Sequence, residues 1–443
     1  MAPSYDPSEA RMRVAFQPDG AEHIFDPSAT WHDHRFTAEE IGAEQTLIES
    51  ASLNPGGQKT QGSPGKIRTG PAPVNVELEP EGMAPYFAVF QRRRRNAIDL
   101  GGGAWRHWLA PEAADVDMRS RRLQLQLYRD DTAIQQAYGA AVAGFSFGTQ
   151  VDQMWTGNFS VVAERADYWG VPNQLDGTTT DPIVRGLARL ELIEDAQKLR
   201  VRIADTNPPE GDVSVEIAID NDAYGASPMF VTFGQWARAI LSSDGSGVGK
   251  PPSHVELLWP EGTNDLAQGN EWEIPIRVET PWVASLPGVR ALPEVETELF
   301  LNGAPFPGSV TSISLDASHT AEPDLGVGGV WPTGTLMSGQ RTILWQLDRR
   351  MVDNFLQRRL EAGVAVHLDV VITSPFTIGS SGVPYRVRFV SPNCLLNGTR
   401  PTITDPNTQR ESYQLNAYPA IPDAEGFSDD LTVVLDNGTA TYG

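Results

Sequence analysis

The sequence predicts a mainly β protein, and three observations support this fold class. Short segments that alternate apolar and polar residues, or are rich in β-branched side chains, recur along the chain as half-buried strands do. Pairs that favour turns, such as Asn302-Gly303 and Asp244-Gly245, separate these segments. Only two segments have the apolar spacing of an amphipathic helix. This combination is typical of antiparallel sandwiches and barrels.

The predicted elements follow one another closely. In order, the strands span residues 74–78, 122–128, 187–193, 198–203, 213–219, 254–259, 271–278, 296–301, 310–315, 342–347, 364–372, 385–390 and 412–417. One helix is expected to start at Glu79-Pro80 and to bury the stripe Met83, Tyr86, Phe87 and Phe90. The other spans 348–363, with Asp348 as N-cap and Gly363 as the C-terminal stop. Its predicted apolar stripe is Met351, Val352, Phe355, Leu356 and Leu360.

A repeat relates the two helical segments. Residues 65–79 ("GKIRTGPAPVNVELE") align without gaps with 334–348 ("GTLMSGQRTILWQLD") at a constant offset of 269 residues. Each stretch reads as a glycine-bounded loop, a strand, an acidic cap and then a helix. Long Gly/Pro-rich loops, 49–66 and 318–335, lie at the same place in both halves, and loops of this length in a compact domain are usually disordered or functional. Their shared position predicts a function.

Composition excludes several functions. With 34 basic and 57 acidic side chains among 443 residues, the formal charge is −23, which disfavours nonspecific binding of duplex DNA. The one cysteine, Cys394, rules out a disulfide within this chain, and we expect it to be a small buried side chain. The opening residues lack a signal-peptide core, and no apolar run reaches the ~18 residues of a spanning helix. We expect synthesis in a cytoplasm without membrane insertion.

The pattern of loop, strand, cap and helix resembles the major tail tube proteins of long-tailed bacteriophages. Residues 148–164 ("GTQVDQMWTGNFSVVAE") are similar to the later strands of such a domain, and 389–418 to its closing strands. The segment "LAQGNEWEIPI" is similar to the ends of β-modules in these proteins, although Asn270 replaces the usual acid. The resemblance implies tube domains at 1–175 and 285–420, a β-sandwich module at 176–284, and a tail at 421–443. The tail could pair with a neighbouring subunit or with its own domain.

The resemblance also implies a role. With two fused tube domains in each chain, three chains would form a ring of six domains. Such trimeric rings would stack and form the conduit for DNA ejection. Expected partners are other copies of the chain and the tail tip, tape measure and tail terminator proteins, with DNA passing unbound and with no cofactor. The protein would be located in the virion. The two long loops would contact the next ring, and the candidate stacking residues are Asn54, Gly57, Gln58, Lys59, Glu322, Asp324, Val327 and Trp331.

Arginines make the second candidate contact. Arg92 to Arg95 are expected at the end of the first helix, and Arg358 and Arg359 occupy the related position in the second. Cations at the C-terminus of a helix interact favourably with the helix dipole, so one interpretation is that these arginines form a solvated helix end. The other is an ion-paired contact with acidic groups of adjacent subunits.

Other chemistries have weaker support. His32 and His34 could hold a metal, but no third ligand is evident, which favours a surface or hydrogen-bonding role. Residues 220–225 lack the later glutamate of a calcium loop, and the glycines of 99–105 indicate a turn. No motif of a nucleophilic, metal-dependent or phosphate-binding enzyme is present, so we expect no enzymatic activity. The alternative function is carbohydrate binding by a β-sandwich protein of a host-recognition apparatus, favoured by eleven tryptophans.

Overall fold

The computed structural model describes residues 11–17, 29–41, 44–49, 62–111, 115–128, 134–167, 173–174, 183–186, 198–208, 211–219, 229–233, 235, 237–241, 253–259, 263, 265–275, 291–325, 332, 334–350, 353–398, 402–405 and 408–442. The predicted mainly β fold is confirmed, since antiparallel strands prevail and the described residues contain two α-helices, α1 (Ala84–Gln91) and α2 (Phe355–Ala362). Twelve of the thirteen predicted strands overlap observed ones, while 187–193 lies outside the described residues.

Contacts divide the chain into two compact units. The small unit comprises Met1–Arg11, Gln126–Gln136 and Ala166–Val283. The large unit comprises Met12–Leu125, Ala137–Arg165 and Ala284–Gly443. The small unit contains most of the predicted module 176–284. Both predicted tube domains contribute to the large unit, because their strands pair with one another.

The small unit contains two antiparallel sheets. One has the order β14 (Asn173–Gln174), β21 (Glu271–Pro275), β16 (Lys198–Asp205), β17 (Val213–Ile219) and β18 (Met229–Val231), and the other β15 (Ile183–Gly186), β20 (Ser253–Leu258) and β19 (Ala237–Leu241). Both sheets supply residues to one apolar core, with Leu257 from β20 and Val201 from β16. Trp259 and Trp272 meet edge to face in that core, with ring centroids 5.6 Å apart. Two sheets around one core have the layering of a β-sandwich.

The remaining strands belong wholly or in part to the large unit. They are β1 (Arg11–Phe16), β2 (His32–His34), β3 (Ala38–Glu39), β4 (Glu44–Glu49), β5 (Gly62–Glu77), β6 (Arg93–Arg94), β7 (Ile98–Gly101), β8 (Ala104–Leu109), β9 (Val116–Asp117), β10 (Leu123–Tyr128), β11 (Ile134–Gln150), β12 (Thr156–Ala163), β13 (Arg165–Asp167), β22 (Thr297–Leu301), β23 (Ala304–Pro305), β24 (Val310–Asp324), β25 (Gly334–Arg350), β26 (Val366–Thr377), β27 (Pro384–Gly398), β28 (Thr402–Asp405), β29 (Thr408–Ala417) and β30 (Thr432–Asn437). A short 3₁₀-helix, Glu294–Glu296, precedes β22.

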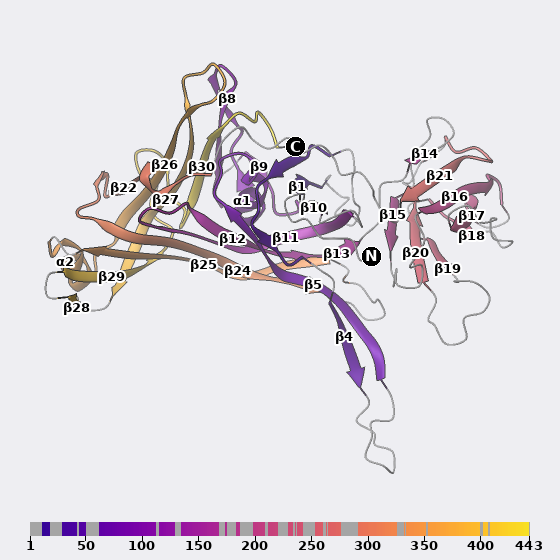
Figure 1. Ribbon diagram of the computed structural model, residues 1–443, viewed down its shortest axis with the longest axis horizontal. Coiled ribbons are helices and arrows are strands. Elements are labelled where there is room, and N and C mark those ends of the chain that lie inside the picture. The colour runs from indigo at the N-terminus through magenta and orange to yellow at the C-terminus, as the bar shows by residue number, and fades with distance from the viewer. Residues whose placement is uncertain are drawn as a thin grey trace, which may run out of the picture. The chain divides into compact units, whose positions relative to one another are not determined.

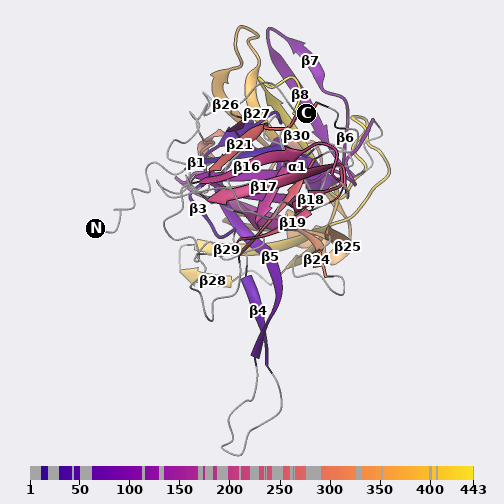
Figure 2. The same cartoon turned by 90° about the vertical axis from the view of Figure 1, so that its right-hand side faces the viewer.

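Eight of these strands pair side by side as one antiparallel sheet, which we call the eight-strand row. Its order is β3, β5, β12, β11, β24, β25, β29 and β27. The long strands β5, β12, β11, β24 and β25 cross the middle of the large unit in Figure 1. At its outer end, β5 also pairs with β4, and this hairpin extends away from the other strands of the large unit in Figures 1 and 2.

Helix α1 packs against one face of the eight-strand row. All eight of its residues are buried, and the predicted stripe from Met83 to Phe90 is buried as expected. The Phe87 ring lies 5.1 Å from both Phe145 of β11 and Phe159 of β12, measured between centroids. Burial of one such aromatic side chain contributes roughly 1.5–3 kcal/mol. This aromatic cluster holds the helix to the sheet.

Both helices begin later than predicted. Helix α1 begins at Ala84 and not at Glu79-Pro80, because the backbone of Leu78 is still hydrogen-bonded to Trp155 and Leu292. Helix α1 ends at Gln91, where Arg92 adopts a left-handed conformation (φ 64°) and its N–H donates to the Ala88 carbonyl. Helix α2 begins at Phe355 and not at Asp348, because Asp348 pairs with Ser312 and Ser412 within the sheet. Pairing on both sides of β25 outweighs the local helical pattern.

The other features of α2 are mixed. Gly363 ends the helix in the left-handed region (φ 61°), as predicted. Leu356 is buried, whereas Phe355 and Leu360 are half-buried. Met351 and Val352 of the predicted stripe lie outside the described residues. Helix α2 therefore covers less of the core than α1 does.

The C-terminal segment pairs within its own chain. Strand β30 lies between β27 and β8, with Val434 opposite both Arg388 and Trp108. Asn437 and Tyr442 beyond it are buried, and the Asn437 amide donates to the Pro80 carbonyl at 2.7 Å. Of the two arrangements that the sequence left open, pairing with its own chain is the one observed. The segment thereby joins early and late parts of the large unit.

Candidate assembly surface

One face of the eight-strand row is polar. Residues that lie directly opposite one another across the strands form a continuous line, namely Ala38, Asn75, Asn158, Ser146, Asp316, Leu344, Asn416 and Leu395. A parallel line two residues along consists of Glu77, Thr156, Gly148, Ser314, Gln346, Gln414 and Asn397. All of these residues are half-buried or exposed. Amides, hydroxyls and carboxylates dominate this polar face, and neither line contains lysine or arginine.

The opposite face is apolar. The line next to the first polar line, on the side away from the second, consists of Val74, Phe159, Phe145, Ala317 and Ile343, which are all buried. Successive side chains of a strand point to opposite faces, so this strict alternation separates the polar face from the core. At one end of the polar face, Arg350 lies opposite Arg410, and both are exposed. The charge of the face therefore changes from neutral or acidic to basic at that end.

The two halves of the chain join edge to edge at β11 and β24. Residues Gly144–Gln150 pair in continuous register with Ser312–Ser318, as seven consecutive pairs. A Cβ on Gly144 would lie 2.6 Å from the Ala317 carbonyl oxygen, so this position needs glycine for the strands to approach. The predictions did not include this junction. The alternation in "GFSFGTQ" (144–150) was the available signal for its first strand.

Each end of the row presents an exposed strand segment. At one end, Thr37, Ala38 and Glu40 are exposed beside β5. At the other end, β26 pairs with β27 as far as Val366 and Cys394. Beyond Cys394, the described pairing of β27 is with β29, and Leu395 is 41% exposed. Exposed edges of this kind are templates for pairing with another chain.

The predicted arginine cluster does not lie at a solvated helix end. Arg92 caps α1, and Arg93 and Arg94 form β6, which pairs with β9 and β8. The Arg95 guanidinium lies 4.2 Å from the centre of the Trp108 ring, a cation–π contact. All four side chains are half-buried. The solvated-end interpretation is therefore wrong, because pairing with β8 and β9 draws the arginines out of the helix.

A second basic segment lies beside the first. The Met118 N–H donates to the Arg92 carbonyl, which brings Arg119 and Arg121 close to β6. Burial lowers the pKa of Arg92, and the nearby Arg119 lowers it further. Burial lowers the pKa of Arg94 in the same way, with a smaller effect from Arg121. The two segments together form a basic surface on a strongly acidic chain.

The structure separates Arg358 and Arg359 from this cluster. They lie on α2, which contacts β27, whereas α1 contacts β6 and β8 (Figure 1). Arg358 is exposed, and the Arg359 guanidinium lies 5.3 Å from the centre of the Phe355 ring. The sequence repeat predicted related positions for the two sets. Their surroundings differ, because the first set is part of a sheet and the second part of a helix.

The predicted stacking loops are described only at their bases. Glu322 and Asp324 lie near the end of β24, opposite Leu336 and Gly334 of β25. The other six candidates, Asn54, Gly57, Gln58, Lys59, Val327 and Trp331, lie outside the described residues. The described bases are both long antiparallel hairpins, β4 with β5 and β24 with β25.

The histidines of the possible metal site serve a structural role. Nε2 of His34 lies 2.8 Å from the Tyr86 hydroxyl in a fully buried contact. Burial lowers the pKa of His34 to about 4, and that of His32 to about 4, so both rings are neutral near pH 7. His32 contacts the Tyr442 ring, with centroids 4.7 Å apart. Among the described residues, no cluster of three or more His, Cys, Asp or Glu side chains could hold a metal ion.

The sequence-based expectations for Cys394 and for the glycine run agree with the structure. Cys394 is fully buried, and burial raises the pKa of its thiol to about 12. Gly101, Gly102 and Gly103 form the turn between β7 and β8, all with positive φ. Residues 220–225 lie outside the described part.

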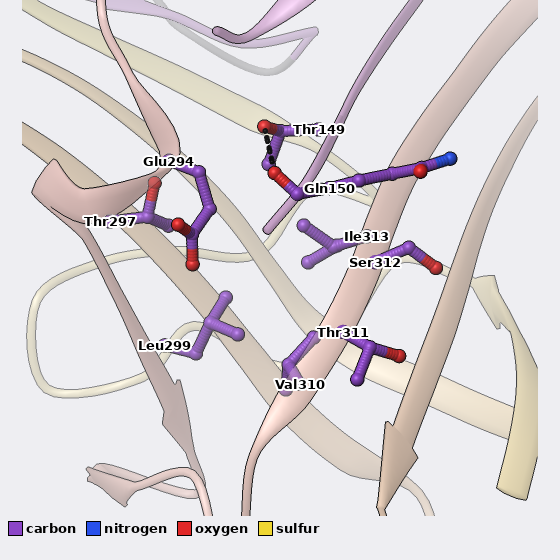
Figure 3. A pocket seen from close by; sticks show the side chains of 9 residues that line it. All are labelled: Thr149, Gln150, Glu294, Thr297, Leu299, Val310, Thr311, Ser312 and Ile313. Atoms are coloured by element: carbon purple, nitrogen blue, oxygen red, sulfur yellow. Dashed lines mark hydrogen bonds between the residues drawn. The ribbon is translucent and has the colours of Figure 1, made fainter. Parts of the chain in front are cut away.

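A small cleft lies at one end of the β11–β24 junction (Figure 3). It is lined by Thr149, Gln150, Glu294, Thr297, Leu299, Val310, Thr311, Ser312 and Ile313. Its volume of about 40 Å³ accommodates a few water molecules and is too small for a sugar ring.

Comparison with known proteins assigns no family. No family model matches the chain, and no curated protein sequence matches it. Within the described part, no helix is both long and apolar enough to cross a bilayer. The function is therefore inferred from the residues of the chain and their arrangement.

Proposed function

We propose that the protein is a structural virion protein that assembles into stacked trimeric rings of a phage tail tube, a conduit for DNA ejection. The observation that carries this proposal is the eight-strand row, which crosses both halves of the chain without interruption. Exposed residues occur at both of its ends, namely Thr37, Ala38 and Glu40 at one end and Leu395 and Asn397 at the other. Closure into a ring would cover such edges and prevent uncontrolled lateral aggregation.

The register of the row supports two related blocks of four strands. The offset of 269 residues relates Asn75 of β5 to Leu344 of β25. Asn75 has Ala38 and Asn158 as neighbours, and Leu344 has Asp316 and Asn416. In each block, the strand that contains this residue, β5 or β25, is followed in the chain by a helix as the next element, α1 after β5 and α2 after β25. A trimer of such chains would contain six blocks, which supports pseudo-six-fold rings.

The polar face is suited to line a DNA conduit. Away from the end with Arg350 and Arg410, its serine, asparagine and glutamine side chains, together with Asp316, Asp348 and Glu77, offer phosphates no ion-pair partner. A lining of arginine or lysine would instead hold the duplex by releasing its counterions. Acidic groups on the wall repel the phosphate backbone of DNA, which favours passage of the duplex without binding. The net charge of −23 is consistent with this role.

The carbohydrate-binding alternative has less support. A tryptophan that stacks on a sugar must present its ring at the surface. Trp155, Trp259, Trp272 and Trp345 are instead fully buried. Trp108 is covered by Phe427 on one side and lies close to Arg95.

Electron microscopy of the purified protein tests the proposal. We expect rings or tubes, and a reconstruction should place the polar face on the lumen with a neutral or acidic wall. Dispersed monomers at every concentration would refute the proposal, and glycan binding by those monomers would favour the alternative. Tubes with a predominantly basic lumen would refute the conduit mechanism but not self-assembly.

A further inference from the structure

We propose that neighbouring chains join through antiparallel pairing of residues 36–38 in one copy with residues 395–397 in the next, with Ala38 opposite Leu395. This inference rests on the proposed self-assembly and specifies the partner and the register of the contact. The partner is a second copy of the chain in head-to-tail orientation. Such a heterologous contact closes into a ring when its rotation permits.

The register follows from the two blocks. If Asn75 and Leu344 occupy equivalent positions in the two blocks, their cross-strand partners are equivalent too. Asn158 lies opposite Asn75 and Asn416 lies opposite Leu344, so Asn158 corresponds to Asn416. One strand further, Ser146 corresponds to Leu395, because Ser146 lies opposite Asn158 and Leu395 opposite Asn416. On the other side, Ala38 corresponds to Asp316, because they lie opposite Asn75 and Leu344.

The β11–β24 junction within one chain shows how the last strand of one block pairs with the first strand of the next block. Ser146 of the first block lies directly opposite Asp316 of the second. The corresponding residues are Leu395 at the end of the second block and Ala38 at the start of a first block. Among the described residues, Ala38 begins the row in its own chain, and the proposal assigns its partner at this contact to another chain. The same line of residues would thus continue around a ring without changing face.

Both segments contain exposed residues. Ala38 and Thr37 are exposed, and Leu395 is 41% exposed, although leucine is usually buried. The pairing of β26 stops at Cys394, which corresponds to Phe145 by the same register. The junction within the chain begins one residue earlier, at Gly144. Among the described residues, the edge of β27 that β26 leaves unpaired therefore begins at Leu395, two residues after the position that corresponds to Gly144.

Engineered disulfides test the register. Ala38→Cys is combined with Leu395→Cys, since directly opposite residues in an antiparallel pair have Cβ atoms about 4.5–5.5 Å apart. Cys394 stays in place because it is buried and points to the other face. The positive control is Ser146→Cys with Asp316→Cys, which should close within one chain. The off-register control is Glu40→Cys with Leu395→Cys, a diagonal of roughly 7–8 Å.

Non-reducing electrophoresis of oxidised, assembled protein is the measurement. The matched pair should give covalent dimers and trimers, and a mixture of the two single-cysteine variants should give dimers only. Tubes that form in the microscope without such cross-links, while the positive control closes, would overturn this register and leave the proposed function intact. Cross-linking that is equal in the off-register control would overturn it too. Monomers that form neither tubes nor cross-links would overturn both proposals.

Discussion

Replacing Glu411 by glutamine tests how β25 and β29 are held together in the eight-strand row. The Arg349 Nε donates to Glu411 Oε2 at 2.8 Å, and neither side chain is exposed to solvent. Arg349 also donates to the carbonyls of Pro307 at 2.9 Å and Asp353 at 3.1 Å. Glutamine keeps the size of the side chain and removes its charge. The substitution therefore leaves a buried guanidinium without its buried anionic partner.

The expected loss of unfolding free energy is about 3 kcal/mol. Removing one partner of a buried ion pair costs about 3–5 kcal/mol, because the remaining charge stays desolvated. We expect the lower end of that range, since the two carbonyls and the Asp353 carboxylate still contact Arg349. A loss of about 3 kcal/mol lowers the equilibrium constant for folding roughly a hundred-fold.

Urea denaturation followed by tryptophan fluorescence measures this loss, because the fully buried Trp345 on β25 reports on the same strand. The matched control is Glu361→Gln on α2, where the carboxylate is exposed and accepts a hydrogen bond from Gln357. We expect that control to stay within about 0.5 kcal/mol of wild type. A Glu411→Gln variant that loses less than about 1 kcal/mol would refute the reasoning. Replacing Arg349 by methionine together with Glu411 by leucine should restore much of the loss.

Three further predictions follow from the large unit. Replacing Arg93 and Arg94 with glutamate should impair ring or tube assembly, as seen by electron microscopy, without changing the circular dichroism spectrum; normal tubes would exclude the contact. Burial raises the pKa of Glu79 from 4.5 to about 8, so its stabilising contribution is complete below pH 4.5 and is lost as the pH rises through 8. Glu79→Gln should remove this dependence from urea midpoints measured between pH 4 and 9, and an unchanged profile would contradict the assignment. Gly157→Ala should cost about 1–3 kcal/mol, because its Cβ would lie 1.9 Å from the Ser146 carbonyl oxygen; a wild-type midpoint would show that the strands can separate.

Sequence patterns predicted which segments form strands and helices better than they predicted where those elements begin and end. The segment 342–347 was recognised as a strand, but β25 runs from Gly334 to Arg350 because it has partners on both sides. The same pairing removed Asp348 from its predicted role as a helix cap. Met83 and Phe87 were placed correctly in a buried stripe, since helical periodicity is a local property. The arginines after α1 were misplaced, because their strand partners, β8 and β9, form contacts that no local pattern contains.

By itself, the sequence determined the mainly β class, the buried cysteine, the acidic charge and the related loop–strand–helix patterns. These properties depend on composition or on neighbours a few residues apart. Only the tertiary structure decided that Ser146 lies opposite Asp316 and that Leu395 remains exposed at the end of the row. The reason is physical, since strand register is set by pairs distant in sequence, while alternation specifies only which side chains share a face. The polar face and its two exposed edges exist only once those distant strands have paired.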